Sequence, residues 1–316
     1  MEQPAVYVGV DVGKQQLEVA LRPGGEQFSL PHDERAVRAL VKRLTPLGCT
    51  RIVVEATGGY ETLVVAALHA GGLPVVLVNP RWARAFAKAI GQLAKTDRID
   101  ARILALYAER AELKLRELPD AQTRELRALC ARRDDLLDML GAEQNRLEHA
   151  PKRLHHEIRA HIDYLRKRLK HLDRDIDGAV RGSELWRHKD ELLDSVPGVG
   201  PVLRASWLAW LPELGTLNRA EAAALVGVAP VNHDSGALRG RRAIEGGRAP
   251  LRRVLYCAAS AAIIWNPHLR AYYDHLIARG KLHKVALVAT MRRLLLILNA
   301  IIKTGTPWKA PCSHVA

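Results

Sequence analysis

The sequence predicts an α/β domain at the N-terminus, a long helical region in the middle and a mostly α-helical C-terminal domain. Short β-branched runs alternate with amphipathic segments over roughly the first 110 residues, which is typical of a sheet covered by helices. Between about residues 120 and 181 glycine nearly vanishes and the strand patterns stop. Aromatic residues make up only 5% of a chain that is 48% hydrophobic, so Leu and Ala must build the core, which favours helices.

The N-terminal domain begins with a β-branched run that ends in an acid and a glycine turn, residues 6–14. Two further strands are expected at 17–22 and 27–30. Helices at 34–43, 60–70 and 81–91 then alternate with strands at 51–54 and 74–78. Leading antiparallel strands with an acid in the first one are how an RNase H-like (RuvC-like) sheet begins.

Four acids in this domain are candidate metal ligands. Asp97 and Asp100 open an amphipathic run and would share one face of its first helical turn, although Thr96 or Asp97 could instead cap that helix. Asp11 lies in the first strand, and Glu55 ends the strand at 51–54, where functional rims form in α/β sheets. No Cys or His is near, so four carboxylates from three elements predict two Mg²⁺ (or Mn²⁺) ions clamping a phosphodiester.

The start of the chain has a second interpretation. Residues 9–14, Gly-Val-Asp-Val-Gly-Lys, also resemble the first phosphate loop of sugar kinases and actin-like ATPases. Those enzymes need a second loop of the type Asp-x-Gly-Thr or Asp-x-Gly-Ser, and none follows residue 120. The kinase interpretation is therefore weak.

The middle region carries two apolar stripes at three- and four-residue steps, which predict a coiled coil. The first stripe is Leu126, Cys130, Leu137, Leu140 and Leu147. The second is Leu154, Ile158, Ile162, Leu165, Leu169, Leu172 and Ile176. Pro151 either kinks one long helix or starts a second helix. A pair of helices this narrow is expected to bury its stripe by dimerisation.

The C-terminal part contains two features suited to DNA. The turn at 192–201 matches a helix-hairpin-helix, in which Gly198 and Gly200 let backbone N–H groups approach a phosphate; an ordinary Pro-Gly turn is the less favoured alternative. Ser235 follows in an Asp-Ser-Gly sequence, which is also common turn chemistry. A hydroxyl nucleophile beside guanidinium groups would suit phosphate chemistry. The candidate phosphate-binding arginines are Arg239, Arg241, Arg242, Arg248, Arg252 and Arg253.

The charge distribution and the cysteines indicate which kind of partner and which compartment to expect. The net charge is +14, and residues 239–316 hold 14 basic residues against two acidic ones, which indicates a polyanion partner, nucleic acid before membrane. His233 and Asp234 beside Ser235 do not make a hydrolase triad, since no Gly-x-Ser-x-Gly elbow is present. The four cysteines are scattered, and no signal peptide is visible. The longest apolar run near the end, 294–302, is too short to span a bilayer. We therefore expect a cytoplasmic protein without a membrane partner.

Taken in order, the motifs resemble the insertion-sequence 110 family of DEDD transposases, which are bridge-RNA-guided recombinases. The resemblance covers nearly the whole chain, although Arg248 stands where a smaller polar residue, often Asn, is expected. The matching segments are Gly-Val-Asp-Val-Gly-Lys at 9–14, Val-Glu-Ala-Thr-Gly-Gly-Tyr at 54–60, Lys-Thr-Asp-Arg-Ile-Asp-Ala at 95–101, Val-Pro-Gly-Val-Gly-Pro at 196–201, Ala-Pro at 229–230, Asp-Ser-Gly at 234–236, Ile-Glu-Gly-Gly-Arg at 244–248 and Leu-Arg-Arg-Val-Leu at 251–255.

The resemblance implies three parts: a RuvC-like DEDD domain at 1–117, a coiled-coil oligomerisation linker at 118–185 and a transposase domain at 186–316. It implies that Asp11, Glu55, Asp97 and Asp100 bind Mg²⁺ and that Ser235 forms a covalent phosphoserine link to DNA. A homodimer or homotetramer, a noncoding bridge RNA paired with donor and target DNA, and a bacterial, nucleoid-associated location are also implied. Two alternatives are a RuvC-like Holliday-junction endonuclease that uses water as nucleophile, and a non-catalytic nucleic-acid scaffold.

Overall fold

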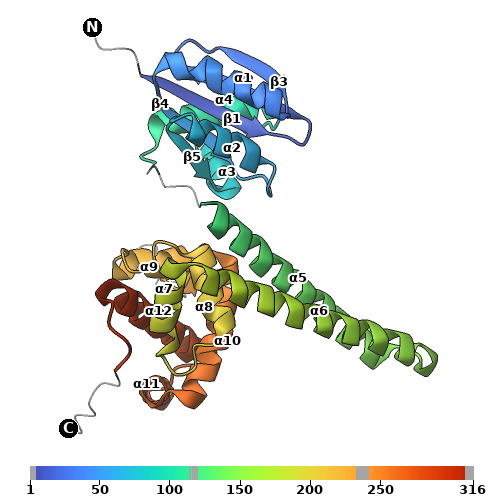
Figure 1. The fold of residues 1–316 in the computed structure, drawn as a ribbon. Helices are drawn as coiled ribbons and strands as arrows, with labels where there is room; N and C mark the ends of the chain where they lie inside the picture. Colours follow the sequence, from blue (N-terminus) through green and yellow to red (C-terminus); the bar gives the residue numbers. More distant parts are fainter. Residues whose placement is uncertain (1–4, 114, 116–119, 233–241, 310–316) are drawn as a thin grey trace. The chain divides into compact units, whose positions relative to one another are not determined.

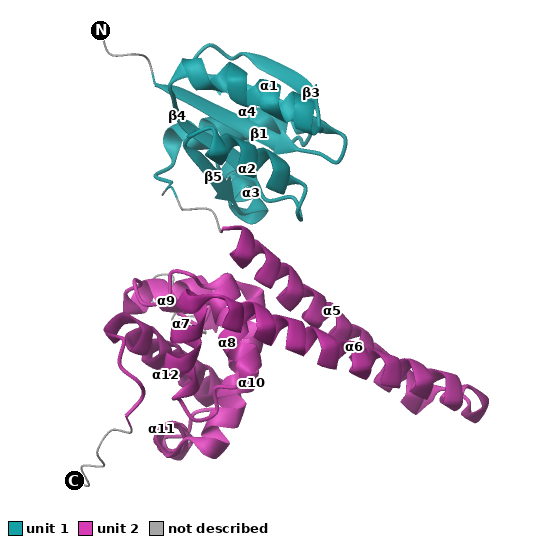
Figure 2. Cartoon of the chain, in the orientation of Figure 1, with its two compact units in different colours: residues 1–118 teal, residues 119–316 magenta. Residues whose placement is uncertain are grey.

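The chain folds into two compact units, Met1–Leu118 and Pro119–Ala316, shown in Figure 2. The computed structural model describes residues 5–113, 115, 120–232 and 242–309. Each unit has its own hydrophobic core: valines and leucines of a sheet and its helices in the first, and a helical core rich in leucine and alanine in the second.

The first unit is built on a five-stranded sheet with the order β3-β2-β1-β4-β5. The strands are β1 (Val6–Val12), β2 (Gln16–Arg22), β3 (Gln27–Pro31), β4 (Cys49–Glu55) and β5 (Val75–Val78). The first three pair antiparallel, whereas β4 pairs parallel with both β1 and β5. The predicted RNase H-like sheet is confirmed in its leading antiparallel strands and in the parallel strands that follow.

Helices cover both faces of this sheet (Figure 1). They are α1 (Glu34–Leu44), followed by the short 3-10 helix η1 (Thr45–Leu47), α2 (Glu61–Ala70), α3 (Pro80–Ala89) and α4 (Asp97–Arg110). Val8 and Val10 pack with α1 and α2 on one face, and Tyr7 packs with the α3 and α4 side on the other. Because side chains alternate along a strand, Gly9 and Asp11 share the face of Tyr7 and are directed toward α4.

The second unit starts with a long helical hairpin formed by α5 (Ala121–His149), a short 3-10 helix η2 (Lys152–Leu154) and α6 (His155–Gly182). Pro151 thus precedes a second helix instead of kinking one long helix, and the two helices lie side by side (Figure 1). The α6 stripe is buried, so the chain itself covers it and no partner is needed for that purpose. Two expected stripe positions were wrong: Leu137 is 39% exposed while its neighbour Leu136 is 4% exposed, and Leu154, in η2, is also 39% exposed.

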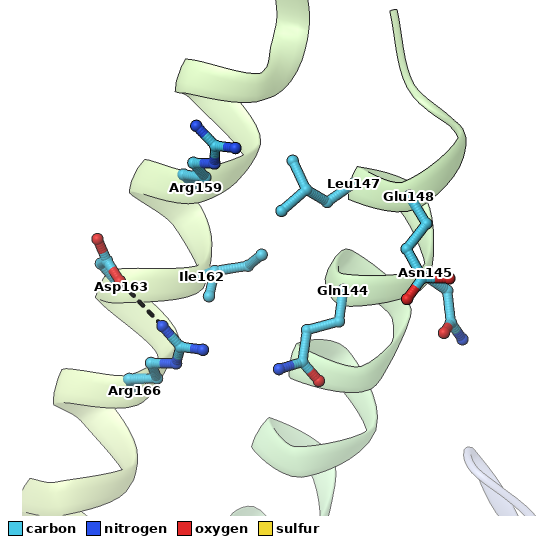
Figure 3. Close-up of a pocket in the computed structure, with 8 residues that line it drawn as sticks. All are labelled: Gln144, Asn145, Leu147, Glu148, Arg159, Ile162, Asp163 and Arg166. Carbon is cyan, nitrogen blue, oxygen red and sulfur yellow. Dashed lines mark hydrogen bonds and ion pairs between the residues drawn. The ribbon is translucent and has the colours of Figure 1, made fainter. Parts of the chain in front are cut away.

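A shallow cleft of about 630 Å³ lies between α5 and α6 near the end where the hairpin reverses. Figure 3 shows Leu147 and Ile162 pointing toward each other across it, while the Asp163–Arg166 ion pair lies on α6. None of the predicted site residues lines this cleft. The cleft is a gap between two packed helices and plays no part in the site described below.

The remaining helices of the second unit form a globular bundle. They are α7 (Glu184–Asp194), α8 (Pro201–Trp210), α9 (Arg219–Val226), α10 (Ala249–Trp265), α11 (Pro267–Ala278) and α12 (His283–Thr304), with a small two-stranded sheet of β6 (Pro230–Val231) and β7 (Ala243–Ile244). By length and composition α12 is apolar enough to cross a membrane. Its Leu294, Leu295 and Leu298 are fully buried in the bundle core, so α12 is the central helix of that core.

Candidate functional site

The structure brings the four predicted acids to one region of the first unit. Asp11 is next to the last residue of β1 and Glu55 is the last residue of β4. The parallel register pairs Val10 with Val54, so Asp11 and Glu55 follow at the same level of adjacent strands. Asp97 and Asp100 lie in the first turn of α4, which packs on β1 and β2.

A close approach between α4 and β1 holds this arrangement. A Cβ built on Gly9 would lie 2.2 Å from the carbonyl oxygen of Ala101 and 2.2 Å from the backbone nitrogen of Ala105. Ala101 and Ala105 are fully buried and pack with Ala20 of β2. Because these residues are small, the helix backbone rests almost directly on the strand, and the turn that carries Asp97 and Asp100 lies toward Asp11.

The N-terminal cap of α4 leaves the acids free. Thr96 is the capping residue, since its Oγ1 accepts a hydrogen bond of 3.2 Å from the backbone N–H of Ile99. Of the two capping residues that the sequence allowed, the structure thus selects Thr96. The carboxylates of Asp97 and Asp100 are therefore available for another function, although acids in a first turn also suit the helix dipole.

Crowding of carboxylates changes the acidity of the site. Burial, then the charges of Asp100, Asp97 and Glu55, raise the pKa of Asp11 from its ordinary value to about 7, and the charge of Lys95 opposes the shift. Burial and the charge of Asp100 likewise raise the pKa of Glu55, again against Lys95. The four acids thus form a set whose mutual repulsion is only partly offset by the protein, as expected where a cation binds.

Two basic residues of the site were missed by sequence reasoning. Burial raises the pKa of Asp100, whereas Lys95 and Arg84 lower it, so both cations face the acids. Arg84 Nη2 donates to the carbonyl oxygen of Leu93 at 2.8 Å, and its buried Nη1 has no hydrogen-bond partner among the described residues. Lys95, two residues before Asp97, could have been found from the motif, but nothing in the sequence singles out Arg84.

A fifth carboxylate, Glu18, was also missed. It pairs with Asp11 across the β1–β2 register and is only 5% exposed. Its Oε1 accepts hydrogen bonds of 2.6 Å from Gln16 Nε2 and from Ser29 Oγ, and its buried Oε2 has no hydrogen-bond partner among the described residues. The alternation of β2 around its buried valine and leucines was the available signal, because it places Glu18 on the face opposite to them.

Glu18 also connects β2 to the acid-bearing turn of α4. Its Oε2 lies 3.8 Å from Arg98 Nε, and Gln27 Nε2 donates to the backbone oxygen of Arg98 at 2.5 Å. Arg98 is positioned between Asp97 and Asp100 in the chain. The β2–β3 edge thus braces the first turn of α4 from the side opposite to β4.

The donor set fits a hard divalent cation. Its members are carboxylates from β1, β4 and α4, with no thiol or imidazole among the charged groups that act on Asp11. Within the described part of the chain, no three acidic, His or Cys side chains stand in a ready-made ligating arrangement. The residues present would hold Mg²⁺ or Mn²⁺ through Asp11, Glu55, Asp97 and Asp100. Burial and then the negative charge of the other three acids raise the pKa of Asp11, and such a cation would neutralise that charge.

The raised pKa of Asp11 predicts how stability depends on pH in protein kept free of metal by a chelator. The folded carboxyl keeps its proton up to about pH 7 and the unfolded one loses it near its ordinary value, so stability falls as pH rises between the two. Asp11→Asn removes this loss and should raise the free energy of unfolding by about 1–2 kcal/mol near pH 8, allowing for solvent at this half-buried group. Denaturant unfolding of both proteins near pH 8 and near pH 4.5 checks this prediction. An equal gain in the free energy of unfolding at the two pH values would show that the ionisation of Asp11 is not its cause.

The predicted nucleic-acid turn in the second unit joins α7 to α8. Gly198 has a φ of +90°, and a Cβ there would lie 2.5 Å from the Cα of Ala262 on α10. Gly200 is exposed with open space around its Cβ position and precedes α8. The close packing of the turn on α10 is thus a structural reason for Gly198, whereas Gly200 remains accessible.

The described arginines of the basic region differ in their surroundings. Arg248 forms two hydrogen bonds with the Glu213 carboxylate, of 2.7 and 2.9 Å, and also donates to the carbonyl of Trp210. It therefore ties the start of α10 to the segment after α8, which explains a large residue where a smaller polar one was expected. Arg252 donates to the carbonyl of Gly246 at 2.5 Å.

The other predicted basic residues are exposed or lie outside the described part of the chain. Arg253 is exposed and lies 3.4 Å from Asp138 of α5, and Arg242 is exposed. Ser235, Arg239 and Arg241 lie outside the described residues. Val231 and Ala243, which flank that segment, are paired in the β6–β7 sheet.

Two family models match the chain in separate parts. A model for IS110-type DEDD enzymes, described as "Transposase", matches residues 8–155. A model described as "Transposase IS116/IS110/IS902 family" matches residues 190–274. The first match includes the region of Asp11, Glu55, Asp97 and Asp100, and the second includes the α7–α8 turn and Ser235.

Two individual proteins and one solved structure are also similar to the chain. The chain is 26% identical to the "Pilin gene-inverting protein" of Moraxella bovis over 81% of each protein. It is also 26% identical to an uncharacterized protein of insertion element IS110 from Streptomyces coelicolor, over 96% of each. A Thermus thermophilus RuvC structure aligns with a TM-score of 0.26 at 16% identity, covering 34% of this chain and 98% of that one. The chain belongs to the IS116/IS110/IS902 transposase family and is a DNA transposase, an enzyme of DNA recombination.

Proposed function

We propose that the chain cuts and rejoins DNA with two catalytic groups, the four-acid cluster of the first unit and Ser235 of the second. The observation that carries this proposal is the crowding of Asp11 by three other carboxylates on one face of a sheet and helix. Such a set is destabilising unless a cation binds there, which is why a Mg²⁺ or Mn²⁺ site is the function it supports best. When bound, the metal would supply positive charge to a scissile phosphate.

The residues of the chain then have separate tasks. The acids would hold the cation against the phosphodiester, and Lys95 and Arg84 oppose the negative charge that develops on it. The Ser235 oxygen forms a bond to phosphorus, the bond from phosphorus to the deoxyribose oxygen breaks, and the serine proton ends on the released hydroxyl. The phosphoserine link conserves the phosphodiester bond energy until strand exchange, when the reverse step rejoins DNA.

Further parts of the proposal concern partners. Arg242, Arg252 and Arg253, with Arg239 and Arg241, are the candidate phosphate contacts of the basic region. The paired role of Arg248 makes it a structural residue in this scheme. The α7–α8 turn would act as a helix-hairpin-helix that binds DNA backbone through Gly200, with Gly198 fixing the turn.

We also propose the three-part division at 1–117, 118–185 and 186–316. The α5–α6 coiled coil, whose shared stripe the chain itself covers, would join subunits into a homodimer or homotetramer through its outer face, where Leu137 and Met139 are exposed. A bridge RNA paired with donor and target DNA, and a cytoplasmic, nucleoid-associated location, complete the proposal. The basic C-terminal region, with 14 basic residues against two acidic ones over residues 239–316, supports a polyanionic partner.

The test of the serine role is Ser235→Ala. Wild-type protein incubated with DNA carrying the element ends and Mg²⁺ should yield a covalent protein–DNA adduct that survives denaturing electrophoresis, and Ser235→Ala should yield none. Ser260→Ala is the matched control, since the Ser260 hydroxyl is engaged with the Tyr256 carbonyl within α10. Cleavage without an adduct in wild-type protein would favour the Holliday-junction endonuclease that uses water.

A further inference from the structure

An exposed aromatic side chain lies in the first turn of α3, the helix that follows β5. Trp82, in the first turn of α3, is 67% exposed, which is unusual for so large an apolar side chain. At helical spacing Ala85 and Ala89 share its face and are exposed as well. Phe86, four residues after Trp82 on the same line of the helix, is only partly exposed and packs on Tyr107 of α4, so the exposed side chains next to the indole along that line are the two alanines.

The charge of the surrounding segment has one sign. Residues 79–95 carry Arg81, Arg84, Lys88 and Lys95 and no acidic residue. Arg81 and Lys88 are exposed on α3 next to the face of Trp82. An aromatic plane bordered by cations matches a nucleic acid strand, whose bases stack on aromatic rings while its phosphates pair with Lys and Arg.

The position of α3 connects this surface to the site. Strand β5 pairs with β4 so that Val78 lies opposite Glu55, and the Ala56 N–H donates to the Val78 oxygen at 3.0 Å. Helix α3 begins two residues after Val78. The start of α3 thus lies near the strand end that carries Glu55, and α3 also packs on α4, the helix that carries Asp97 and Asp100.

We propose that Trp82 is a stacking platform for an unpaired base of the DNA strand held at the four acids, with Arg81 and Lys88 contacting its flanking phosphates. This rests on the proposed function, since it takes the bound strand to be the one that is cut. A base paired within a duplex has both faces covered, so the platform selects DNA that is locally opened. Stacking of this kind tolerates any base, because every base has a π-face.

The test measures binding of full-length protein, in a chelating buffer that prevents cleavage, to a labelled oligothymidylate of about a dozen nucleotides and to an abasic oligomer of the same length. Wild-type protein should bind the thymidylate more tightly. Trp82→Ala should weaken thymidylate binding by about 5- to 100-fold and leave abasic binding unchanged, so that the preference for bases is lost. Trp82→Phe should keep most of the preference for the thymidylate, because phenylalanine retains an aromatic ring. Trp265→Ala, at a tryptophan that is 71% exposed at the end of α10, is the matched control.

Three results would overturn the inference. Equal loss for the two oligomers in Trp82→Ala would assign the residue to general binding or to the fold, which a thermal melt of the variant checks. A loss seen with oligouridylate but not with oligothymidylate would assign the platform to RNA. Unchanged binding with a changed sedimentation profile would assign it to a contact between proteins. Because no cleavage is measured, none of these results bears on the catalytic roles of the acids or Ser235.

Discussion

Asp100→Asn is expected to lower DNA strand cleavage by on the order of 10³-fold while DNA affinity stays within a few fold. After burial, the negative charge of Asp100 is the largest cause of the raised pKa of Asp11 and of Glu55. Asp100 therefore interacts strongly with both of these acids. An amide keeps its size but removes a charged metal ligand, and several kcal/mol of transition-state stabilisation go with it. Cleavage of labelled DNA in Mg²⁺ and binding in chelator, measured on the same preparation, separate the two effects.

The control for this variant is Glu34→Gln. Glu34 is an exposed acid in the first turn of α1, on the other face of the sheet, where it pairs with Arg38. Cleavage by Glu34→Gln should match the wild type, because a surface ion pair of this kind contributes little. If Asp100→Asn cleaved DNA at a rate near that of Glu34→Gln, the four-acid site would not be the catalytic centre.

Gly9→Ala is expected to destabilise the first unit by about 3 kcal/mol or more, although it adds a single methyl group. The new Cβ would lie 2.2 Å from backbone atoms of Ala101 and Ala105, and helix backbone has no rotamer that can move aside. The helix must therefore shift away from β1, and with it the turn that bears Asp97 and Asp100. Denaturant unfolding should show the loss, and cleavage should fall together with it.

Gly141→Ala provides the opposite case. Gly141 lies within α5, and a Cβ there would meet no heavy atom within 4 Å. Alanine is the better helix former, so this variant should be neutral or gain about 0.5–1 kcal/mol. A Gly9→Ala protein as stable as Gly141→Ala would mean that α4 does not rest on β1 as described.

Much of the first unit could be predicted because its signals are local. Short β-branched runs, amphipathic spacing and turn residues depend on a few neighbours, and they gave the strand sequence and helices that the structure confirms. It was harder to predict which leucines of α5 are buried in the α5–α6 hairpin. Leu136 and Leu137 are adjacent and equally apolar, and only the packing of α5 on α6 and its neighbours decides that Leu136 is buried.

The sequence by itself determined which residue types were available for catalysis: four carboxylates in recognisable motifs, a serine in a glycine turn and a strongly basic C-terminal region. Tertiary structure alone decided which further groups face the acids. The charge of Arg84 lowers the pKa of Asp100 from another helix, and Glu18 lies across a strand pair from Asp11. The physical reason is that electrostatic effects depend on distance and burial in space, and a chain that folds back brings together charges whose sequence separation carries no such information.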